Sequence, residues 1–108
     1  MDKELEKYSM EKWGKNIYQD AIDKWGVNSQ FDQIIEEMAE LTVAISKYRR
    51  QYNDSLLPEQ KEKIMENLFE ELADVKMNLE EMEYIFGKEK IQKTYDQKME
   101  KFFKQLYK

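Results

Sequence analysis

Two long stretches of the sequence carry an apolar residue at every third or fourth position, and this spacing constrains the fold more than any other feature. With 3.6 residues per turn, such positions share one face of a helix. The first stretch predicts a helix of about six turns, with an apolar stripe of Phe31, Ile34, Ile35, Met38, Leu41, Thr42, Ile45, Tyr48 and Tyr52. The second predicts a helix ending near Phe86, and its apolar side holds Ile64, Leu68, Leu72, Val75, Leu79, Met82 and Phe86.

The first two helix boundaries are predicted from glycine and capping residues. The segment from Lys12 to Trp25 has helical spacing, and Gly26 suits the left-handed position just past a helix end. Ser29, with Asp32 three residues later, resembles a capping box. We therefore expect a first helix that ends near Trp25 and a second that begins near Ser29.

The later boundaries are equally well marked. The segment 53–58, NDSLLP, supplies turn formers and a proline suited to the first turn of the next helix, and Gly87 suits its end. Residues 88–107 place apolar side chains at helical intervals among many lysines, which predicts a fourth helix. The expected fold is all-α, a single four-helix bundle-like domain over residues 1–108.

Composition narrows the class of protein. A chain of 108 residues buries a modest fraction of its surface, so we expect helices to pair across a homodimer or homotetramer interface. The sequence has no Cys and no His, which excludes thiolate metal sites, imidazole catalysis and histidine-based di-iron sites. The absence of Cys agrees with a reducing compartment.

The net charge and the hydropathy pattern exclude some classes of binding partner. A formal net charge of −5 disfavours a protein that binds nucleic-acid polymers, because such binding depends on clustered Lys and Arg. The first ten residues, MDKELEKYSM, lack the apolar core of a signal peptide, and no apolar run is long enough to span a bilayer. We expect a cytoplasmic protein that does not engage a membrane.

Carboxylates border the apolar stripes of the two long helices. Glu36, Glu37 and Glu40 fall within an arc of roughly 100° on the first. On the second, Glu71 projects onto the apolar side, and Asp74 lies on the adjoining flank. Partly buried like charges are costly unless a cation lies between them. An all-oxygen set across two helices suits Mg²⁺ or Mn²⁺.

The segments EEMAE at 36–40 and ELAD at 71–74 read as EExxE followed by ExxD. This ordered pair resembles the MazG-like nucleoside triphosphate pyrophosphohydrolases of the all-α NTP pyrophosphatase superfamily. The resemblance covers about residues 25–86 and includes Gln30 ahead of the first motif. One departure is the connector of 30 residues between Glu40 and Glu71, which is long for a compact member.

The resemblance implies Mg²⁺-dependent cleavage of a nucleoside triphosphate between its α and β phosphates, which yields a monophosphate and pyrophosphate. By motif position, the expected metal ligands are Glu37, Glu40, Glu71 and Asp74. Glu36 is expected to act as a further metal ligand, as a hydrogen-bond partner that orients a metal ligand, or as the base that orients water.

Candidate substrate contacts lie outside the motifs. Asn78, one turn after Asp74, could bond a phosphate, and Trp25 and Gln30 could stack on and hydrogen-bond a nucleobase. Lys98 and Lys101 resemble the late basic positions of the family that approach the phosphates. Lys47 is a further phosphate candidate, although a cation near a helix end also stabilises the helix dipole.

Two alternative interpretations of the sequence assign no catalytic role to the carboxylates. The acidic edge could be a solvated or salt-bridged helix face of an interaction module that binds a basic partner protein. The chain could also bind a nucleotide without hydrolysing it, as a sensor does. Titration with Mg²⁺ separates the first of these from an enzyme, because an interaction module needs no tight metal site.

Overall fold

The computed structural model describes residues 16–108, and every regular element in this range is helical. The elements are α2 (Ile17–Trp25), α3 (Val27–Gln51), α4 (Pro58–Phe86) and α5 (Lys88–Leu106). The prediction of an all-α fold is confirmed for this range. The predicted start of the first helix, residues 12–15, lies outside the described residues.

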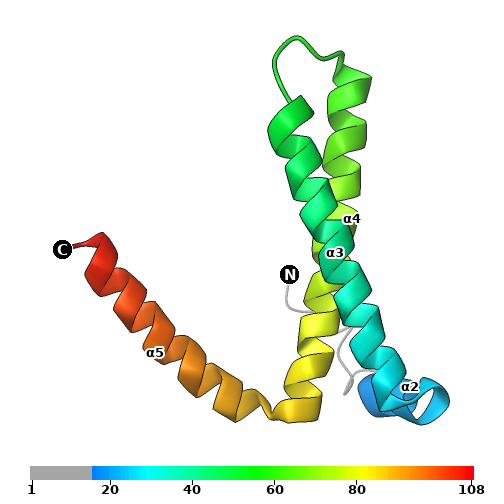
Figure 1. The fold of residues 1–108 in the computed structure, drawn as a ribbon, viewed down its shortest axis with the longest axis vertical. Coiled ribbons are helices and arrows are strands. Elements are labelled where there is room, and N and C mark those ends of the chain that lie inside the picture. The colour runs from blue at the N-terminus through cyan, green and yellow to red at the C-terminus, as the bar shows by residue number, and fades with distance from the viewer. Residues whose placement is uncertain (1–15) are drawn as a thin grey trace, which may run out of the picture.

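Helices α3 and α4 run antiparallel, side by side, and form the main body in Figure 1. The loop between them, residues 52–57, is short, and the start of α4 is well capped. Pro58 occupies the first position of α4, where its missing N–H would have no helical partner. The backbone N–H of Leu57 donates to Oε1 of Gln60 at 2.9 Å, which satisfies a second group at this end. These signals fix the start of α4 at the predicted proline.

The core of this helix pair is thin. Ile34 and Ala44 on α3 and Val75 on α4 are the buried apolar residues of the described chain. Several members of the predicted apolar stripes are half-buried and others are exposed, including Ile35 at 65%. A helix packed against a single neighbour covers only part of a wide stripe, and the rest faces outward.

The junction of α2 and α3 differs from the sequence prediction. Helix α2 ends at Trp25 as expected, but α3 begins at Val27, two residues before Ser29. Gly26 serves as the last cap of α2 and the first cap of α3, at φ +89°. The predicted Ser29 capping box is therefore wrong, because this glycine turns the chain so sharply that the next helix restarts at once.

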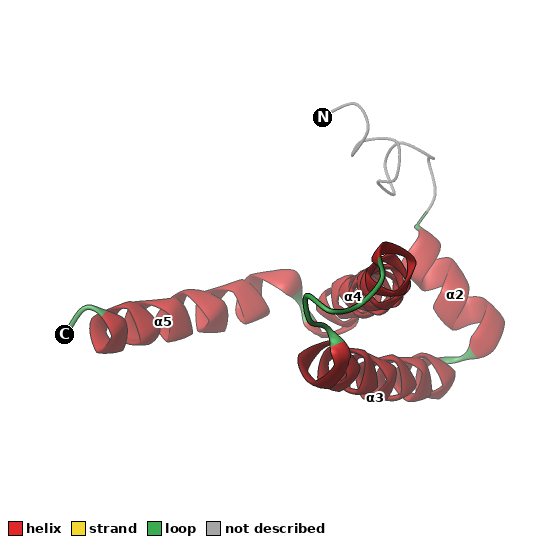
Figure 2. Cartoon of the chain, turned by 90° about the horizontal axis from the view of Figure 1, so that it is seen from above, coloured by secondary structure: helices red, strands yellow, loops and turns green. Residues whose placement is uncertain are grey.

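Polar bonds attach α2 to α4. The hydroxyl of Tyr18 donates to Oε2 of Glu80 at 2.9 Å, and burial raises the pKa of Tyr18, so the hydroxyl keeps its proton. The Tyr84 hydroxyl donates to Oε1 of Gln19 at 2.7 Å and accepts from Nδ2 of Asn16 at 3.1 Å. Helix α2 thus forms a wall across one end of the α3–α4 pair, as Figure 2 shows from above.

Helix α5 leaves the end of α4 at Gly87, which has φ +106°, and projects away from the other helices (Figures 1 and 2). None of its residues is buried. A single chain therefore does not close the expected four-helix arrangement over the described residues, because the fourth helix has no groove to fill. None of the described helices is both long enough and apolar enough to cross a lipid bilayer.

Candidate functional site

Three of the predicted ligands converge between α3 and α4. Glu37, Glu71 and Asp74 each place one carboxylate oxygen within 4.8 Å of the others. All three residues are partly buried. Among residues 16–108, no Lys or Arg forms a salt bridge with these carboxylates. Like charges therefore meet at short range without a neutralising side chain in the described part of the chain.

Two oxygens of this cluster have no hydrogen-bond partner although they are buried. They are Oε2 of Glu37 and Oε2 of Glu71. The other oxygen of Glu37 accepts a bond of 2.8 Å from Nε2 of Gln33. A carboxylate oxygen shielded from water is unfavourable without a hydrogen-bond donor or a cation beside it. The two oxygens are thus placed where a cation or a donor would stabilise them.

The electrostatics agree with this geometry. Desolvation raises the pKa of Glu37, and the negative charges of Asp74 and Glu40 raise it further. Desolvation also raises the pKa of Glu71, followed by the effect of Glu40. The surrounding negative charges therefore disfavour ionisation of Glu37 and Glu71.

Glu36 and Glu40 lie on the outer side of the cluster and are exposed. With Glu71, they line an open hollow of about 350 Å³. Glu40 raises the pKa of both Glu37 and Glu71, and its side chain is within hydrogen-bonding reach of Glu71, so it borders the cluster without belonging to the group that converges within 4.8 Å. The structure thus separates the five predicted acidic residues into three that converge and two at the rim.

A second concave space adjoins the inner side of the cluster. It has a volume of about 310 Å³ and opens between α2, α3 and α4. Glu37 and Asp74 form one end of its lining. The remaining lining residues are Ile17, Tyr18, Ala21, Trp25, Gln30, Gln33, Met77, Asn78 and Glu81. We refer to this space as the inner cavity.

Three sequence-predicted contact residues lie in the inner cavity. Trp25 lines it with a ring that is 59% exposed, under the ammonium of Lys24 at 5.1 Å. Asn78 lines it and donates from Nδ2 to the backbone oxygen of Asp74 at 2.8 Å. Gln30 is buried at 9% exposure. The cavity thus combines an aromatic face, amide groups and the carboxylates of the cluster.

The structure also places Glu81 in this lining, and Glu81 is a residue that sequence reasoning missed. Its side chain is 4% exposed, and burial raises its pKa. The Gln30 amide is oriented with its nitrogen towards Glu81, because the reverse orientation would set oxygen against oxygen. This nitrogen donates to Oε1 at 2.9 Å and to Oε2 at 2.8 Å. Glu81 lies two helical turns after Asp74, and this periodicity is the signal that could have found it.

The three predicted lysines do not line the inner cavity. Lys47 is exposed on α3, ten positions beyond Glu37 towards the far end of the helix pair. Lys98 and Lys101 lie on α5, which runs away from α3 and α4 (Figure 1). Within one chain, the structure therefore does not bring these lysines to the acidic cluster.

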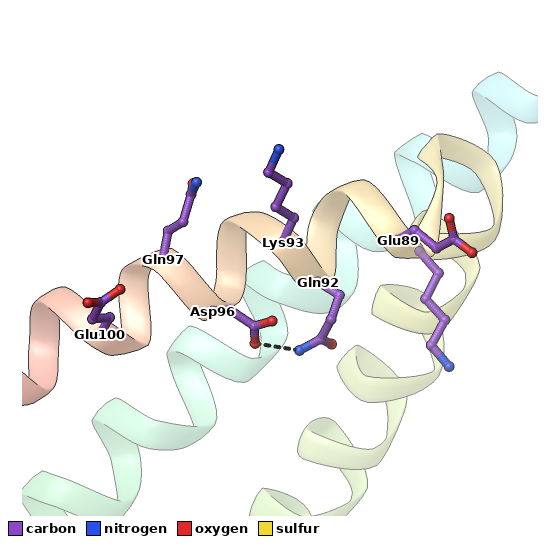
Figure 3. A pocket seen from close by; sticks show the side chains of 7 residues that line it. Glu89, Gln92, Lys93, Asp96, Gln97 and Glu100 are labelled. Atoms are coloured by element: carbon purple, nitrogen blue, oxygen red, sulfur yellow. Dashed lines mark hydrogen bonds between the residues drawn. The ribbon is translucent and has the colours of Figure 1, made fainter.

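A further hollow of about 530 Å³ is lined by residues of α5 alone. Figure 3 shows that Lys93 and Gln97 point away from Gln92 and Asp96. Nε2 of Gln92 donates to Oδ1 of Asp96 at 2.9 Å, and both side chains are exposed. This surface has no converging set of groups and no second wall, so the candidate site is the acidic cluster with the inner cavity.

Comparison of the chain with protein-family models, with curated proteins and with solved structures finds no match. The assignment of a function therefore depends on the residues and the geometry described above.

Proposed function

We propose that this protein is a Mg²⁺-dependent nucleoside triphosphate pyrophosphohydrolase, which cleaves between the α and β phosphates and releases a monophosphate and pyrophosphate. The observation that carries the proposal is the pair of buried, unpartnered oxygens of Glu37 and Glu71 beside Asp74. A cluster of this kind needs a positive counter-charge. A triphosphate that arrives with a divalent cation supplies one.

The donor set fits such a cation. All candidate ligands are carboxylates, which Mg²⁺ and Mn²⁺ prefer over softer donors. The oxygens of Glu37, Glu71 and Asp74 lie within 4.8 Å of one another, so these three residues would hold a divalent cation between them.

The chain's own residues have distinct roles in this proposal. Glu37, Glu71 and Asp74 hold the cation, and Glu40 joins them from the rim. Glu36, exposed at the same rim, orients the attacking water. When bound, Mg²⁺ offsets the negative charge of the phosphates and lowers the pKa of water at the site.

The inner cavity provides the place for the nucleoside. It begins at Glu37 and Asp74 and extends along α2, where Trp25 offers a ring face for a base. The order EExxE then ExxD, with its resemblance to MazG-like enzymes, supports the same reaction from the sequence. Asn78, between the cluster and the far end of the cavity, is placed for a hydrogen bond to the sugar or to a phosphate.

The test is pyrophosphate release from a panel of nucleoside triphosphates, with Mg²⁺ and with Mn²⁺. We expect turnover of at least one nucleotide and none in the presence of EDTA. Calorimetric titration with Mg²⁺ accompanies the assay. Nucleotide binding without turnover would identify a sensor, and the absence of both metal binding and turnover would favour an interaction module.

We also propose that the working unit is a homo-oligomer. Much apolar surface lies on α5, where Phe102 is 57% exposed and Phe103 is 62% exposed. A second copy that covers this helix would also close the bundle that one chain leaves open, and could bring Lys98 or Lys101 to the phosphates.

A further inference from the structure

The far end of the inner cavity holds a buried carboxylate whose only described partner is an amide. Glu81 is 4% exposed and Gln30 is 9% exposed, and both line the cavity. Among residues 16–108, no Lys or Arg forms a salt bridge with Glu81. Burial of a carboxylate is unfavourable unless donors surround it. The amide of Gln30 supplies a single N–H₂ group, so lone pairs on both oxygens of Glu81 stay available to further donors.

The position of this pair relative to the acidic cluster is regular. Gln30 precedes Glu37 by seven residues on α3, and Glu81 follows Asp74 by seven on the antiparallel α4. Two layers of polar side chains therefore lie across the helix pair, one formed by Glu37 and Asp74 and the other by Gln30 and Glu81. At a rise of 1.5 Å per residue, the two layers are separated by about 10 Å along the helix axis. This separation matches the distance from the α-phosphate of a nucleotide to the outer edge of its base.

The cavity lining between the two levels is suited to a flat ring. Ile17, Ala21 and Met77 give apolar contacts, and Trp25 gives an aromatic face. Binding sites of this type combine apolar walls with a few polar groups that fix orientation. Within the described lining, Glu81 and Gln30 are the buried polar groups.

We propose that Glu81, held in place by Gln30, recognises the exocyclic amino group of the nucleobase, so that the protein selects amino-bearing nucleotides over those with a carbonyl at that position. The inference rests on the proposed function and names the substrate class of the same site. In the orientation assigned to its amide, Gln30 donates to both oxygens of Glu81, so both oxygens act as acceptors. An amino N–H of cytosine or adenine donates to such a group. The carbonyl oxygen of uracil or hypoxanthine faces acceptor lone pairs and is repelled.

Two matched pairs of nucleotides test the proposal. Cytidine triphosphate has an exocyclic amino group where uridine triphosphate has a carbonyl oxygen. Adenosine and inosine triphosphates differ in the same way. Binding of the nonhydrolysable α,β-imido analogues with Mg²⁺ is measured by calorimetry on the full chain. We expect the amino member of at least one pair to bind about tenfold to a hundredfold more tightly, because the carbonyl member leaves a buried acceptor without a donor.

Three variants separate recognition from packing. Glu81→Gln is nearly isosteric and is expected to bring the ratio within a pair close to one. The swap Gln30→Glu with Glu81→Gln keeps one carboxylate and one amide in the pair and is expected to restore a preference. Glu66→Gln, an exposed change on the same helix, is the control that leaves the ratio unchanged. Thermal unfolding identifies any variant that fails to fold. If Glu81→Gln alone does not fold, the swap variant is used in its place.

The outcomes distinguish the two proposals. Equal binding within both pairs, or a preference that persists in folded Glu81→Gln, overturns the role of Glu81 and leaves the hydrolase proposal standing. A lack of binding by all four nucleotides overturns the role of Glu81, and the pyrophosphate-release panel then decides the hydrolase proposal separately. A preference that disappears in Glu81→Gln and is unchanged in Glu66→Gln supports recognition, because a purely structural carboxylate would not discriminate between bases.

Discussion

Glu37 on α3 and Asp74 on α4 face each other across the antiparallel helix pair, with carboxylate oxygens that approach within 4.8 Å. Glu71, one turn before Asp74, completes the group from the same helix. The two helices therefore hold like charges together by their packing. If the proposed divalent cation binds here, it would relieve the repulsion among these carboxylates, and the predictions below follow from that proposal.

Replacement of Glu71 by Gln is expected to abolish turnover without unfolding the protein. The change removes a charge whose ionisation is already disfavoured by burial and by Glu40, so the melting temperature without metal should stay the same or rise. We expect at least about a hundredfold loss of Mg²⁺ affinity, since even indirect partners of metal ligands contribute 10–100-fold. Calorimetry and thermal unfolding measure the two effects. Glu70→Gln, at the exposed neighbouring position, is the matched control; an unfolded Glu71→Gln would contradict the prediction.

Stability without metal is expected to fall as the pH rises above the ordinary carboxylate pKa of 4.5. Glu37 and Glu71 have raised pKa values, so the folded state binds more protons than the unfolded state between 4.5 and those raised values. Stability is then greatest below this window and is lost through it. Melting temperatures measured from pH 4 to 8 in EDTA should show the decline. A flat or rising profile in EDTA would count against the cluster.

Addition of Mg²⁺ is expected to reverse that decline at neutral pH. Metal ligands must be deprotonated, so Mg²⁺ affinity should increase with pH over the same window. A ligand present at a hundred times its Kd stabilises the fold by about 2.7 kcal/mol. The measurement is the melting temperature at pH 7.5 with and without Mg²⁺. The double variant Glu37→Gln with Glu71→Gln should show no such increase.

Tyr84→Phe is expected to weaken nucleotide binding more than the chemical step. The Tyr84 hydroxyl bonds Gln19 and Asn16, and these bonds hold α2 against α4 as a wall of the inner cavity. Each lost hydrogen bond is worth about 0.5–1.5 kcal/mol, so KM should rise roughly threefold to tenfold with little change in kcat. Tyr48→Phe removes a hydroxyl from α3 away from that cavity and serves as the control. Equal losses in kcat would place Tyr84 in another role.

Substitution of Phe102 by Glu on α5 is expected to reduce the oligomeric state. Phe102 is 57% exposed in the single chain, and burial of an aromatic side chain in an interface is worth about 1.5–3 kcal/mol. Light scattering after size-exclusion chromatography measures the mass, and circular dichroism checks that helix content is kept. Gln97→Glu, an exposed polar position of the same helix, should leave the mass unchanged. A monomeric parent protein would refute the interface.

The helical spacing of apolar residues by itself determined the two long helices, and proline and glycine determined most of their ends. Pro58, Gly26 and Gly87 mark boundaries because their backbone preferences act locally, whatever the rest of the chain does. The prediction that the second helix begins near Ser29 was wrong because of another local backbone preference. Gly26 adopted a conformation that let α3 begin earlier, and sequence alone does not show which of two adjacent caps is used.

The acidic residues were predictable as a set but not as an arrangement. Helix periodicity put five carboxylates beside the apolar stripes, and only the register of α3 against α4 decided that Glu37, Glu71 and Asp74 converge while Glu36 and Glu40 stay at the rim. That register depends on packing between residues far apart in the chain. The same register placed Gln30 against Glu81, and the direction of α5 kept Lys98 and Lys101 away from the cluster within one chain. Local sequence sets which face of a helix is polar, whereas tertiary packing sets what that face meets.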